Sequence, residues 1–446
     1  MGLRTTAVPA PGGRSPAPAV SRRYAWVVFA LSFGLLLSDY MSRQVLNSVF
    51  PLLKAEWGLT DAQLGSLSGV VALAVGVLTF PTSFLADRWG RVRSLVLAAV
   101  VWSLATLACA VAAGYGQMFL ARLFVGIGEA AYGSVGIALV LSVFPARLRA
   151  TLSGAFMGGG SFGSVLGVAL SGVIAQHFGW RWAFGVMGFF GLGLAVAFAV
   201  VVTERRLDPR RDATAGRPEE QAKVRLRSLL PQLFSSVSVV SAYAGSGLQL
   251  FLPGALLAWL PSFFNRYYHM STGRAGVTAG LFALLTGIGM VLGGVVADRV
   301  GRTLQIRKWA TAIVCSLLSL VLLSAAFGAP TGTVQMLLLA AGSLVSGATA
   351  GPAAAMVANL TPGAISGTAF GTLTLANSLL GLAPGSAVTG MAADRLGLLD
   401  ALRLMPLVAA VAALCFAVGR RHYERDIIRL AARTTSAATR TTAVTA

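Results

Sequence analysis

The sequence predicts an all-α integral membrane protein in which twelve transmembrane helices form two six-helix bundles. Of its 446 residues, 56% are hydrophobic and only 11% are charged, whereas soluble domains carry about 25% charged residues. Apolar runs long enough for a bilayer-spanning helix, which needs roughly 18–20 residues, recur along the chain. One long hydrophilic segment divides these runs into two sets of six.

Turn residues and charges separate the apolar runs and set the expected order of helices. In the first half, spans are predicted near residues 25–50, 62–86, 94–113, 117–143, 149–176 and 182–203. In the second half, they are predicted near residues 229–264, 275–297, 309–328, 333–358, 365–393 and 401–419. The expected organisation is a disordered cytoplasmic N-terminal tail at 1–23, a first bundle at 24–203, a cytoplasmic linker at 204–228, a second bundle at 229–419 and a cytoplasmic C-terminal tail at 420–446.

The formal net charge of +20 would suit a nucleic-acid partner, but the distribution of the charge indicates membrane topology. With these spans, 27 of the 35 Lys and Arg lie at the N-terminus, in even-numbered connections or in the C-terminal tail, six lie in odd-numbered connections and two lie inside spans. This asymmetry is the positive-inside pattern of a chain with both termini in the cytoplasm. We therefore expect a multi-pass protein of the plasma (cytoplasmic) membrane that binds no nucleic acid.

Residues that could form a catalytic or metal centre are few and scattered. The three cysteines, Cys109, Cys315 and Cys415, lie in separate apolar segments without a spaced partner, so no disulfide or zinc site is predicted. None of the three lysines follows a glycine, so the sequence has no Walker A phosphate loop. The chain is expected to be neither an enzyme nor an ATPase and to use no cofactor or metal.

Arg122 and Glu129 place a cation and an anion seven residues apart inside the fourth apolar run. Seven residues are nearly two helical turns, so both side chains lie on one face of the helix, about 10 Å apart along its axis. Each charge costs roughly 2.5–3.5 kcal/mol at the middle of a membrane-spanning helix. Both are therefore expected to face a protein interior or a watery cavity rather than lipid.

Asp39, Arg43 and Asn47 recur every four residues along the first predicted helix, with Tyr40 and Gln44 beside them. This spacing makes a polar stripe on an apolar helix. If the first and fourth helices face one cavity, that cavity gathers two carboxylates and two arginines. The alternative is that permanent ion pairs only hold the helices together. Burying four charges would cost roughly 10–14 kcal/mol, and hydrophobic residues would usually hold the helices as well, so we favour a function.

Two similar hexapeptides lie at matching positions in the two halves. Ala86-Asp-Arg-Trp-Gly-Arg91 follows the second predicted span, and Ala297-Asp-Arg-Val-Gly-Arg302 follows the eighth. These connections resemble the signature loop of the major facilitator superfamily, and the resemblance covers residues 24–419. It implies the major facilitator fold, alternating access, and cytoplasmic gating contacts that stabilise the outward-facing state; simple topological anchors are the alternative. The residues implied in gating are Asp87, Arg88, Gly90, Arg91, Asp298, Arg299, Gly301 and Arg302.

Further motifs narrow the resemblance within the superfamily. They are Arg122-x3-Gly-x-Gly-Glu129-Ala, Phe144-Pro-Ala-Arg147 and Phe178-Gly-Trp-Arg-Trp-Ala-Phe184. These motifs look most like those of spinster-like lipid transporters and of the related anion:cation symporters, which carry organic anions. Spinster-like first helices place an Asp directly before an Arg-Gln-Val-Leu run, where this chain has Ser42. The nearest acid is Asp39, about one turn earlier, whereas Arg122 and Glu129 match the motif directly.

We interpret the chain as a proton-coupled secondary transporter of a small organic anion. Arginine stays protonated, so the candidates for proton coupling are Glu129 and Asp39; which of them is the main proton site is left open. An anion that recruits Arg43 or Arg122 through bidentate hydrogen bonds would release a carboxylate to take a proton. Substrate identity, direction of transport and stoichiometry do not follow from the sequence.

The second half has no ionisable residue in mid-membrane, so it is expected to shape selectivity. Gln249, Asn377 and Thr374 are its candidate polar contacts, although hydrogen bonds between helices are an equal alternative. Two other functions stay open: a spinster-type exporter of lysolipids or sphingoid lipids, and a non-transporting membrane sensor, which would need a large extra domain. We expect a monomer whose partners are protons, the lipid bilayer and a small-molecule or lipid substrate.

Overall fold

The computed structural model describes residues 21–130, 132–144, 148–203, 233–234, 236–302, 304–361 and 366–445. Every regular element in these ranges is a helix. Most of the predicted N-terminal tail and the whole predicted linker at 204–228 lie outside the described residues. The side chains of the C-terminal residues from 431 onward are also not described.

The first half contains the six predicted spans in order. They are α1 (Arg22–Trp57), α2 (Asp61–Trp89), α3 (Arg91–Ala110), α4 (Tyr115–Glu129) with α5 (Tyr132–Val143), α6 (Arg149–Phe178) and α7 (Trp180–Val201). The span predicted at 117–143 is thus described as two helices. Glycine ends α1 and α6, because Gly58 and Gly179 adopt φ values of 65° and 90° that other residues rarely reach.

The second half also follows the predicted order. Its elements are α11 (Val237–Tyr267), α12 (Thr272–Gly301), α13 (Arg307–Gly328), α14 (Thr333–Gly347) with α15 (Ala350–Leu360), α16 (Ser366–Asn377), the π-helical η3 (Ser378–Leu382), α17 (Ala383–Leu396), α18 (Leu398–Leu404) and α19 (Leu407–Thr445). The helix predicted from residue 229 instead begins at Val237, because the Ser236 side chain caps it by accepting a hydrogen bond from the Val239 amide.

Ten helical segments of the described chain are long and apolar enough to cross a membrane. The tenth predicted span appears among them as one segment, Thr333–Leu360. The fourth and eleventh predicted spans are not among the ten, since each is described as shorter consecutive helices. The order and type of the elements still agree with twelve spans in two groups of six.

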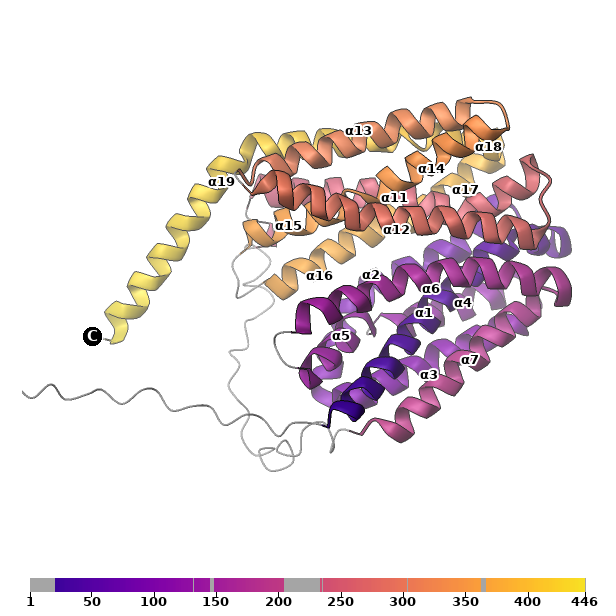
Figure 1. The fold of residues 1–446 in the computed structure, drawn as a ribbon, viewed down its shortest axis with the longest axis horizontal. Coiled ribbons are helices and arrows are strands. Elements are labelled where there is room, and N and C mark those ends of the chain that lie inside the picture. The colour runs from indigo at the N-terminus through magenta and orange to yellow at the C-terminus, as the bar shows by residue number, and fades with distance from the viewer. Residues whose placement is uncertain are drawn as a thin grey trace, which may run out of the picture.

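The two halves lie side by side as separate groups of helices (Figure 1). They meet mainly where α6 packs on α12, α2 on α17 and α1 on α11, with further contacts of α2 with η3 and α16 and of α1 with α12. Small residues allow close approach at these seams. A Cβ at Gly276 would lie 2.8 Å from the backbone oxygen of Val168, and one at Gly69 would lie 2.9 Å from that of Ala383.

The largest buried apolar cluster joins the halves at one end, where α1 ends and α2 begins. We call this the Asp61 end, after the first residue of α2. Phe50 of the first half and Trp259 of the second have ring centroids 5.2 Å apart in this cluster. Two further clusters each belong to one half, around Trp102 in the first and around Trp309 in the second. The apolar core therefore bridges the halves at the Asp61 end.

Glycine also allows close packing inside the second half, where α12 lies against α14, and this contact can be tested. A Cβ at Gly289 would overlap the backbone oxygen of Leu344, so Gly289→Ala should lower the free energy of unfolding by about 1–3 kcal/mol. Thermal unfolding in detergent, followed by size-exclusion chromatography, measures the effect. Gly185→Ala is the matched control, because no atom lies within 4 Å of that Cβ position. Equal melting temperatures for the two variants would contradict the described contact.

Candidate functional site

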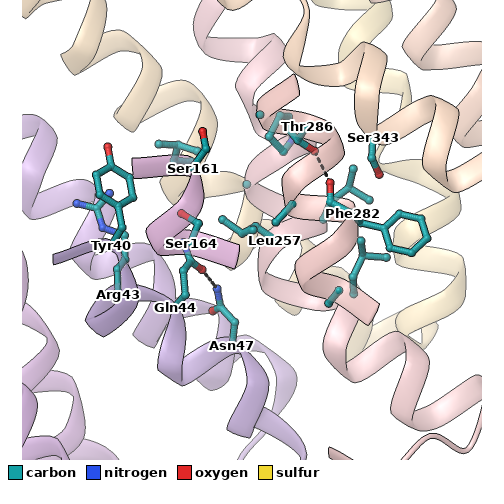
Figure 2. A pocket seen from close by; sticks show the side chains of 18 of the residues that line it. Tyr40, Arg43, Gln44, Asn47, Ser161, Ser164, Leu257, Phe282, Thr286 and Ser343 are labelled. Atoms are coloured by element: carbon teal, nitrogen blue, oxygen red, sulfur yellow. Dashed lines mark hydrogen bonds between the residues drawn. The ribbon is translucent and has the colours of Figure 1, made fainter. Parts of the chain in front are cut away.

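A cavity of about 280 Å³ lies between the two halves. From the first half it is lined by Tyr40, Arg43, Gln44, Asn47, Ser68 and residues of α6 such as Ser161 and Ser164. From the second half it is lined mainly by apolar residues of α11 and α12, among them Leu257 and Phe282. Figure 2 shows these polar and apolar side chains on opposite sides. The volume is close to the lower end of small-molecule sites, roughly 300–1,000 Å³.

Arg43 is the cation that faces this cavity. Its side chain is 18% exposed and lies on α1 three residues after Tyr40, so the guanidinium sits 5.3 Å from the centre of the Tyr40 ring. Its Nε donates to Oε2 of Glu129 at 2.9 Å, and its Nη2 lies 2.7 Å from the same oxygen. The guanidinium therefore contacts both the cavity and a buried carboxylate.

Glu129 and Asp39 lie behind Arg43 and do not line the cavity. Glu129 and Asp39 are each 3% exposed, and the two carboxyls are close enough to interact electrostatically. Oε1 of Glu129 and Oδ1 of Asp39 are buried without a hydrogen-bond partner among the described residues. Two buried carboxylates side by side repel one another. Arg43, which pairs with Glu129 and interacts electrostatically with Asp39, offsets this repulsion.

Hydrogen bonds within the first half hold the other polar residues of the cavity wall. Nδ2 of Asn47 donates to Oε1 of Gln44 at 2.6 Å. Ser68, on α2, donates to Oδ1 of Asn47 at 2.9 Å. Four of the five residues of the predicted polar stripe, Tyr40, Arg43, Gln44 and Asn47, thus lie in the cavity wall, whereas Asp39 lies behind it.

Arg122 does not face the cavity, contrary to the prediction that it could recruit substrate. Its side chain is fully buried and donates to three backbone oxygens: Leu67 at 3.4 Å, Ser42 at 3.3 Å and Arg43 at 3.0 Å. These contacts tie α4 to α1 and α2. The sequence showed that Arg122 avoids lipid, but backbone carbonyls, which have no sequence signature, satisfy it.

Gln249 and Asn377 also lie outside the described lining of the cavity. Nε2 of Gln249 donates to Oγ of Ser319 at 3.2 Å and to the backbone oxygen of Ser346 at 3.4 Å. Oδ1 of Asn377 accepts a hydrogen bond from Ser246 at 2.8 Å. Both side chains join helices of the second half, as in the alternative of hydrogen bonds between helices, and their role as substrate contacts stays a prediction.

The residues implied in gating lie at the opposite end from Asp61. The side chains of Asp87 and Arg88 are outside the described residues. Gly90 adopts a φ of 99° between α2 and α3, and Arg91 begins α3. In the second hexapeptide, Asp298 pairs with Lys308 at 3.2 Å within its own half.

Gly301 packs against the Lys308 side chain, whereas Arg299 and Arg302 are exposed. No ion pair between the halves is described for the residues of the second hexapeptide whose side chains are placed. The predicted gating role of both hexapeptides therefore stays a prediction.

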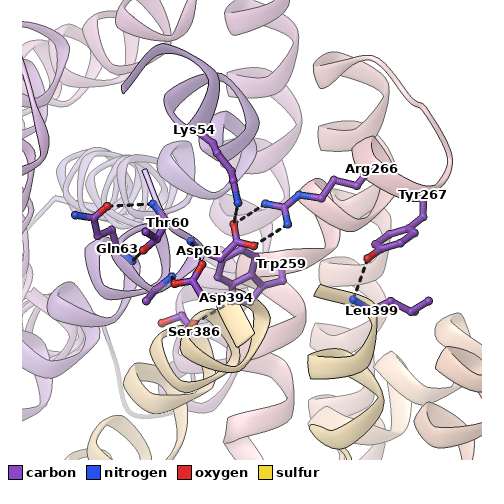
Figure 3. Close-up of polar contacts among 11 residues, drawn as sticks. Lys54, Thr60, Asp61, Gln63, Trp259, Arg266, Tyr267, Ser386, Asp394 and Leu399 are labelled. Carbon is purple, nitrogen blue, oxygen red and sulfur yellow. Dashed lines mark hydrogen bonds and ion pairs between the residues drawn. The ribbon is translucent and has the colours of Figure 1, made fainter. Parts of the chain in front are cut away.

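A polar network at the Asp61 end joins the halves and was not predicted from the sequence (Figure 3). Oδ1 and Oδ2 of Asp61 accept from Nη2 and Nη1 of Arg266 at 2.6 and 2.8 Å. Lys54 also donates to Oδ1 of Asp61, at 2.7 Å. The carboxylate is 4% exposed, whereas Arg266 is 26% and Lys54 40% exposed. A bidentate ion pair thus connects the start of α2 with the end of α11.

Asp394 adds a second polar connection at the same end. Its two carboxylate oxygens accept hydrogen bonds from the backbone amides of Asp61 at 2.7 Å and Ala62 at 2.9 Å. The first amides of a helix have no partner within the helix, and its N-terminus favours negative charge. A residue of the second half thus caps a helix of the first. In the sequence, Asp61 directly precedes the apolar run at 62–86 and Asp394 directly follows the run at 365–393. Because 333 residues separate the two, nothing in the sequence pairs them.

Comparison with known proteins gives one family match and a set of distant relatives. The Major Facilitator Superfamily matches residues 32–386. A gallate transporter of Pseudomonas putida is 28% identical over 62% of this chain and 66% of its own length. A hexuronate transporter of Bacillus subtilis is 26% identical over 61% of this chain and 64% of its own length. The chain thus spans just under two thirds of the length of these relatives.

Solved structures share the fold. A bacterial homologue of the human lysosomal transporter Spinster, crystallised in an inward-facing and unoccupied conformation, has a TM-score of 0.79 at 19% identity, covering 91% of this chain and 99% of that one. A D-xylose–proton symporter has a TM-score of 0.69 at 19% identity, covering 89% of this chain and 97% of that one. At these identities the likeness concerns the fold alone.

The Asp61 network should stabilise closure of this end. Asp61→Asn removes the charge that Arg266 and Lys54 share, and we expect closure to weaken by about 2 kcal/mol, roughly thirtyfold in population, since both partners are partly exposed. Double electron–electron resonance between labels at Val111 and Val334, exposed positions at this end of the two halves, would report longer distances. The labelled chain has its three cysteines replaced by alanine.

Asp400→Asn is the control for that variant. Asp400 also pairs with an arginine, Arg403, at 2.8 Å, but both are about half exposed and belong to the same helix. Its distance distribution should match that of the parent chain. An Asp61→Asn distribution identical to the parent's would show that the network does not govern closure.

Arg122 should behave as a structural residue. Arg122→Met leaves buried carbonyl oxygens without their donor, so we expect the free energy of unfolding to fall by about 1–3 kcal/mol. Thermal unfolding in detergent measures this, with Arg181→Met as the control because Arg181 is 48% exposed. If Arg122→Met melted at the same temperature as the parent chain but failed to bind anions, Arg122 would be a substrate-binding residue and not a structural one.

Proposed function

Because the chain belongs to the major facilitator superfamily, whose members are transporters and not enzymes, we propose that it is a proton-coupled secondary transporter. It moves a small organic anion across the membrane by alternating access of the cavity to the two sides. The observation that carries this proposal is the Arg43–Glu129 pair. It joins the cavity wall to a buried pair of carboxyls.

Binding of the anion begins at Arg43. A guanidinium presents parallel N–H donors that match a carboxylate, and such charge-assisted pairs are stronger than neutral hydrogen bonds. Arg43 is the arginine of the described cavity lining, and Gln44 and Asn47 provide further polar contacts beside it. A substrate carboxylate that engages the exposed edge of Arg43 competes with Glu129 for the same guanidinium.

Proton uptake follows from that competition. When Arg43 turns its charge toward the substrate, Glu129 loses its counter-ion beside a second carboxyl, Asp39, and taking a proton becomes favourable. A monoanion and a proton together add no net charge to the site. The loaded protein can therefore change conformation without burying an extra charge in the low-dielectric core.

Alternating access requires that one end opens while the other closes. We propose that the Asp61 end faces the outside and that both termini lie in the cytoplasm of a cell whose plasma membrane holds the protein. The described contacts between the halves at the Asp61 end, through Arg266 and Asp394, then correspond to a state closed to the outside. Opening outward requires these contacts to break, and the two Asp-Arg-x-Gly-Arg connections would hold the cytoplasmic end.

The relatives support this choice of cargo. The gallate and hexuronate transporters are carriers of organic anions, and the D-xylose–proton symporter shares the fold and couples transport to protons. The Spinster homologue fits the alternative of lysolipid or sphingoid-lipid export. The cavity of about 280 Å³ and its arginine favour a small anion. We propose that the protein is a monomer.

Glu129→Gln tests the coupling. Glutamine can still accept a hydrogen bond from Arg43 but cannot carry a proton, so substrate exchange should persist while substrate-driven proton movement falls at least tenfold. The measurement is the internal pH of proteoliposomes, reported by a trapped dye, with gallate, glucuronate, benzoate and lysophosphatidylcholine supplied in turn. Glu56→Gln, which removes a partly exposed carboxylate paired with Arg181, should keep normal coupling.

Each outcome of that experiment bears on a different part of the proposal. Unchanged proton movement in Glu129→Gln would overturn the role of Glu129 and leave Asp39 as the proton site. Transport of anions without any proton movement in the parent chain would overturn coupling altogether. Movement of lysolipid but of none of the three acids would replace the proposed cargo with the lipid alternative.

A further inference from the structure

The two walls of the cavity differ in chemistry. The wall from the first half carries a guanidinium, a phenol, two carboxamides and serine hydroxyls. The wall from the second half is formed largely by aliphatic and aromatic side chains, including Leu250, Leu257, Phe282, Met290 and Leu382. Figure 2 shows Leu257 and Phe282 across the cavity from Arg43 and Gln44. A ligand that spans the cavity therefore meets polar groups on one side and apolar surface on the other.

Few polar groups of the second wall are available to a ligand. The hydroxyl of Thr286 donates to the backbone oxygen of Phe282 at 3.1 Å, and that of Ser386 donates to the backbone oxygen of Ala383 at 3.1 Å. Ser343 is the hydroxyl of this wall that has no partner among the described residues. Besides the Ser343 hydroxyl, whose oxygen is itself buried, the second wall thus offers a ligand mainly apolar surface.

From this asymmetry we infer that the transported anion is amphipathic: it carries one carboxylate, held at Arg43, and an apolar body that packs against Leu257, Phe282 and Met290. The inference rests on the proposed function and names its substrate class. These three residues of α11 and α12 would then determine specificity, a role that the sequence suggested for Gln249 and Asn377.

Solvation explains why polyhydroxylated acids should be rejected. A sugar acid entering this cavity must strip water from hydroxyls that the second wall cannot pair, apart from the one that reaches Ser343. An apolar site rejects even a single added hydroxyl by roughly a hundredfold. An apolar ring instead gains from leaving water, and its burial removes water from Leu257 as well.

Size sets the upper limit on the apolar body. A cavity of roughly 150 Å³ suffices to bind benzene, so the cavity of about 280 Å³ has room for a six-membered ring with a carboxylate. The cavity is still close to the lower end of small-molecule sites. The substrate class is therefore a compact ring or short-chain monocarboxylate.

Four probes built on a six-membered ring separate charge from polarity. Benzoate and cyclohexanecarboxylate carry the carboxylate on an apolar ring, D-glucuronate carries it on a hydroxylated ring, and benzamide has the apolar ring without charge. Binding of each to the purified full-length protein in lipid nanodiscs is measured by isothermal titration calorimetry. We expect both apolar acids to bind at least a hundredfold more tightly than D-glucuronate, and benzamide to bind far more weakly than benzoate.

Variants of the second wall then test the assignment of specificity. Leu257→Gln and Met290→Gln each place a carboxamide with hydrogen-bonding groups in the apolar wall, so each should narrow the ratio of benzoate to D-glucuronate affinity at least tenfold. Met336→Gln is the matched control, since Met336 is a partly buried methionine of the second half outside the described lining. Thermal unfolding of each variant identifies any general loss of structure.

The outcomes separate this inference from the function on which it rests. Two results together would support both the anion transporter and the amphipathic substrate. Benzoate binding is lost in Arg43→Gln, and the ratio of benzoate to D-glucuronate affinity narrows in Leu257→Gln and Met290→Gln but not in Met336→Gln. D-glucuronate binding as tightly as benzoate, still lost in Arg43→Gln, would overturn the amphipathic substrate and leave the anion transporter standing. Absence of binding for every acid, or equal binding of benzamide and benzoate, would overturn the proposed function together with the inference.

Discussion

A charge inside a membrane-spanning bundle needs a partner of opposite charge. Arg43 has one such partner, Glu129, and also faces a cavity that a second partner could enter. Its guanidinium is paired with Glu129 inside the first half and remains 18% exposed to the cavity. Isolated in an apolar interior, either member of the pair would cost several kcal/mol. In the proposed mechanism, a carboxylate that enters the cavity changes the environment of Glu129, and through it that of Asp39. Coupling of anion binding to proton uptake would then follow from one side chain shared between two partners.

The contacts between the halves bear on the proposed exposure of this site to alternate sides of the membrane. At the Asp61 end, an apolar cluster and a polar network span the seam together, and Asp394 caps α2 from the opposite half. Asp394 and Arg266 both contact residues at the start of α2. Separation of the halves here must break them together, which makes a partly opened state unfavourable. An all-or-none change between two states is what alternating access requires.

The two halves contribute different kinds of side chain to the cavity. The first half provides the ionisable groups and the hydrogen-bonded wall of Gln44, Asn47 and Ser68. The second half uses its buried polar groups to hold its own helices together, as Gln249 does with Ser319. What remains for the cavity on that side is apolar surface. The ionisable groups and the apolar surface of the cavity thus come from different halves of the chain.

Much of the fold could be predicted from the sequence, because it depends on local patterns. Long apolar runs, the placement of basic residues and the repeated hexapeptide predict the order of helices and the two halves. The spacing of Tyr40, Arg43, Gln44 and Asn47 predicts one polar face of α1, since helical geometry alone determines which residues share a face. The exclusion of Arg122 and Glu129 from lipid is equally a local conclusion, set by the cost of a charge in hydrocarbon.

Only the tertiary structure decided which partner each buried polar group has. Arg122 and Arg43 look alike in sequence, yet one is satisfied by backbone oxygens and the other by Glu129. Gln249 and Asn377 turn toward neighbouring helices rather than the cavity, and Asp61 meets Arg266 and Asp394 across the seam. Periodicity fixes the face of a helix that is buried, but not what lies opposite that face. Those pairings depend on how helices far apart in the chain are packed, which no local pattern encodes.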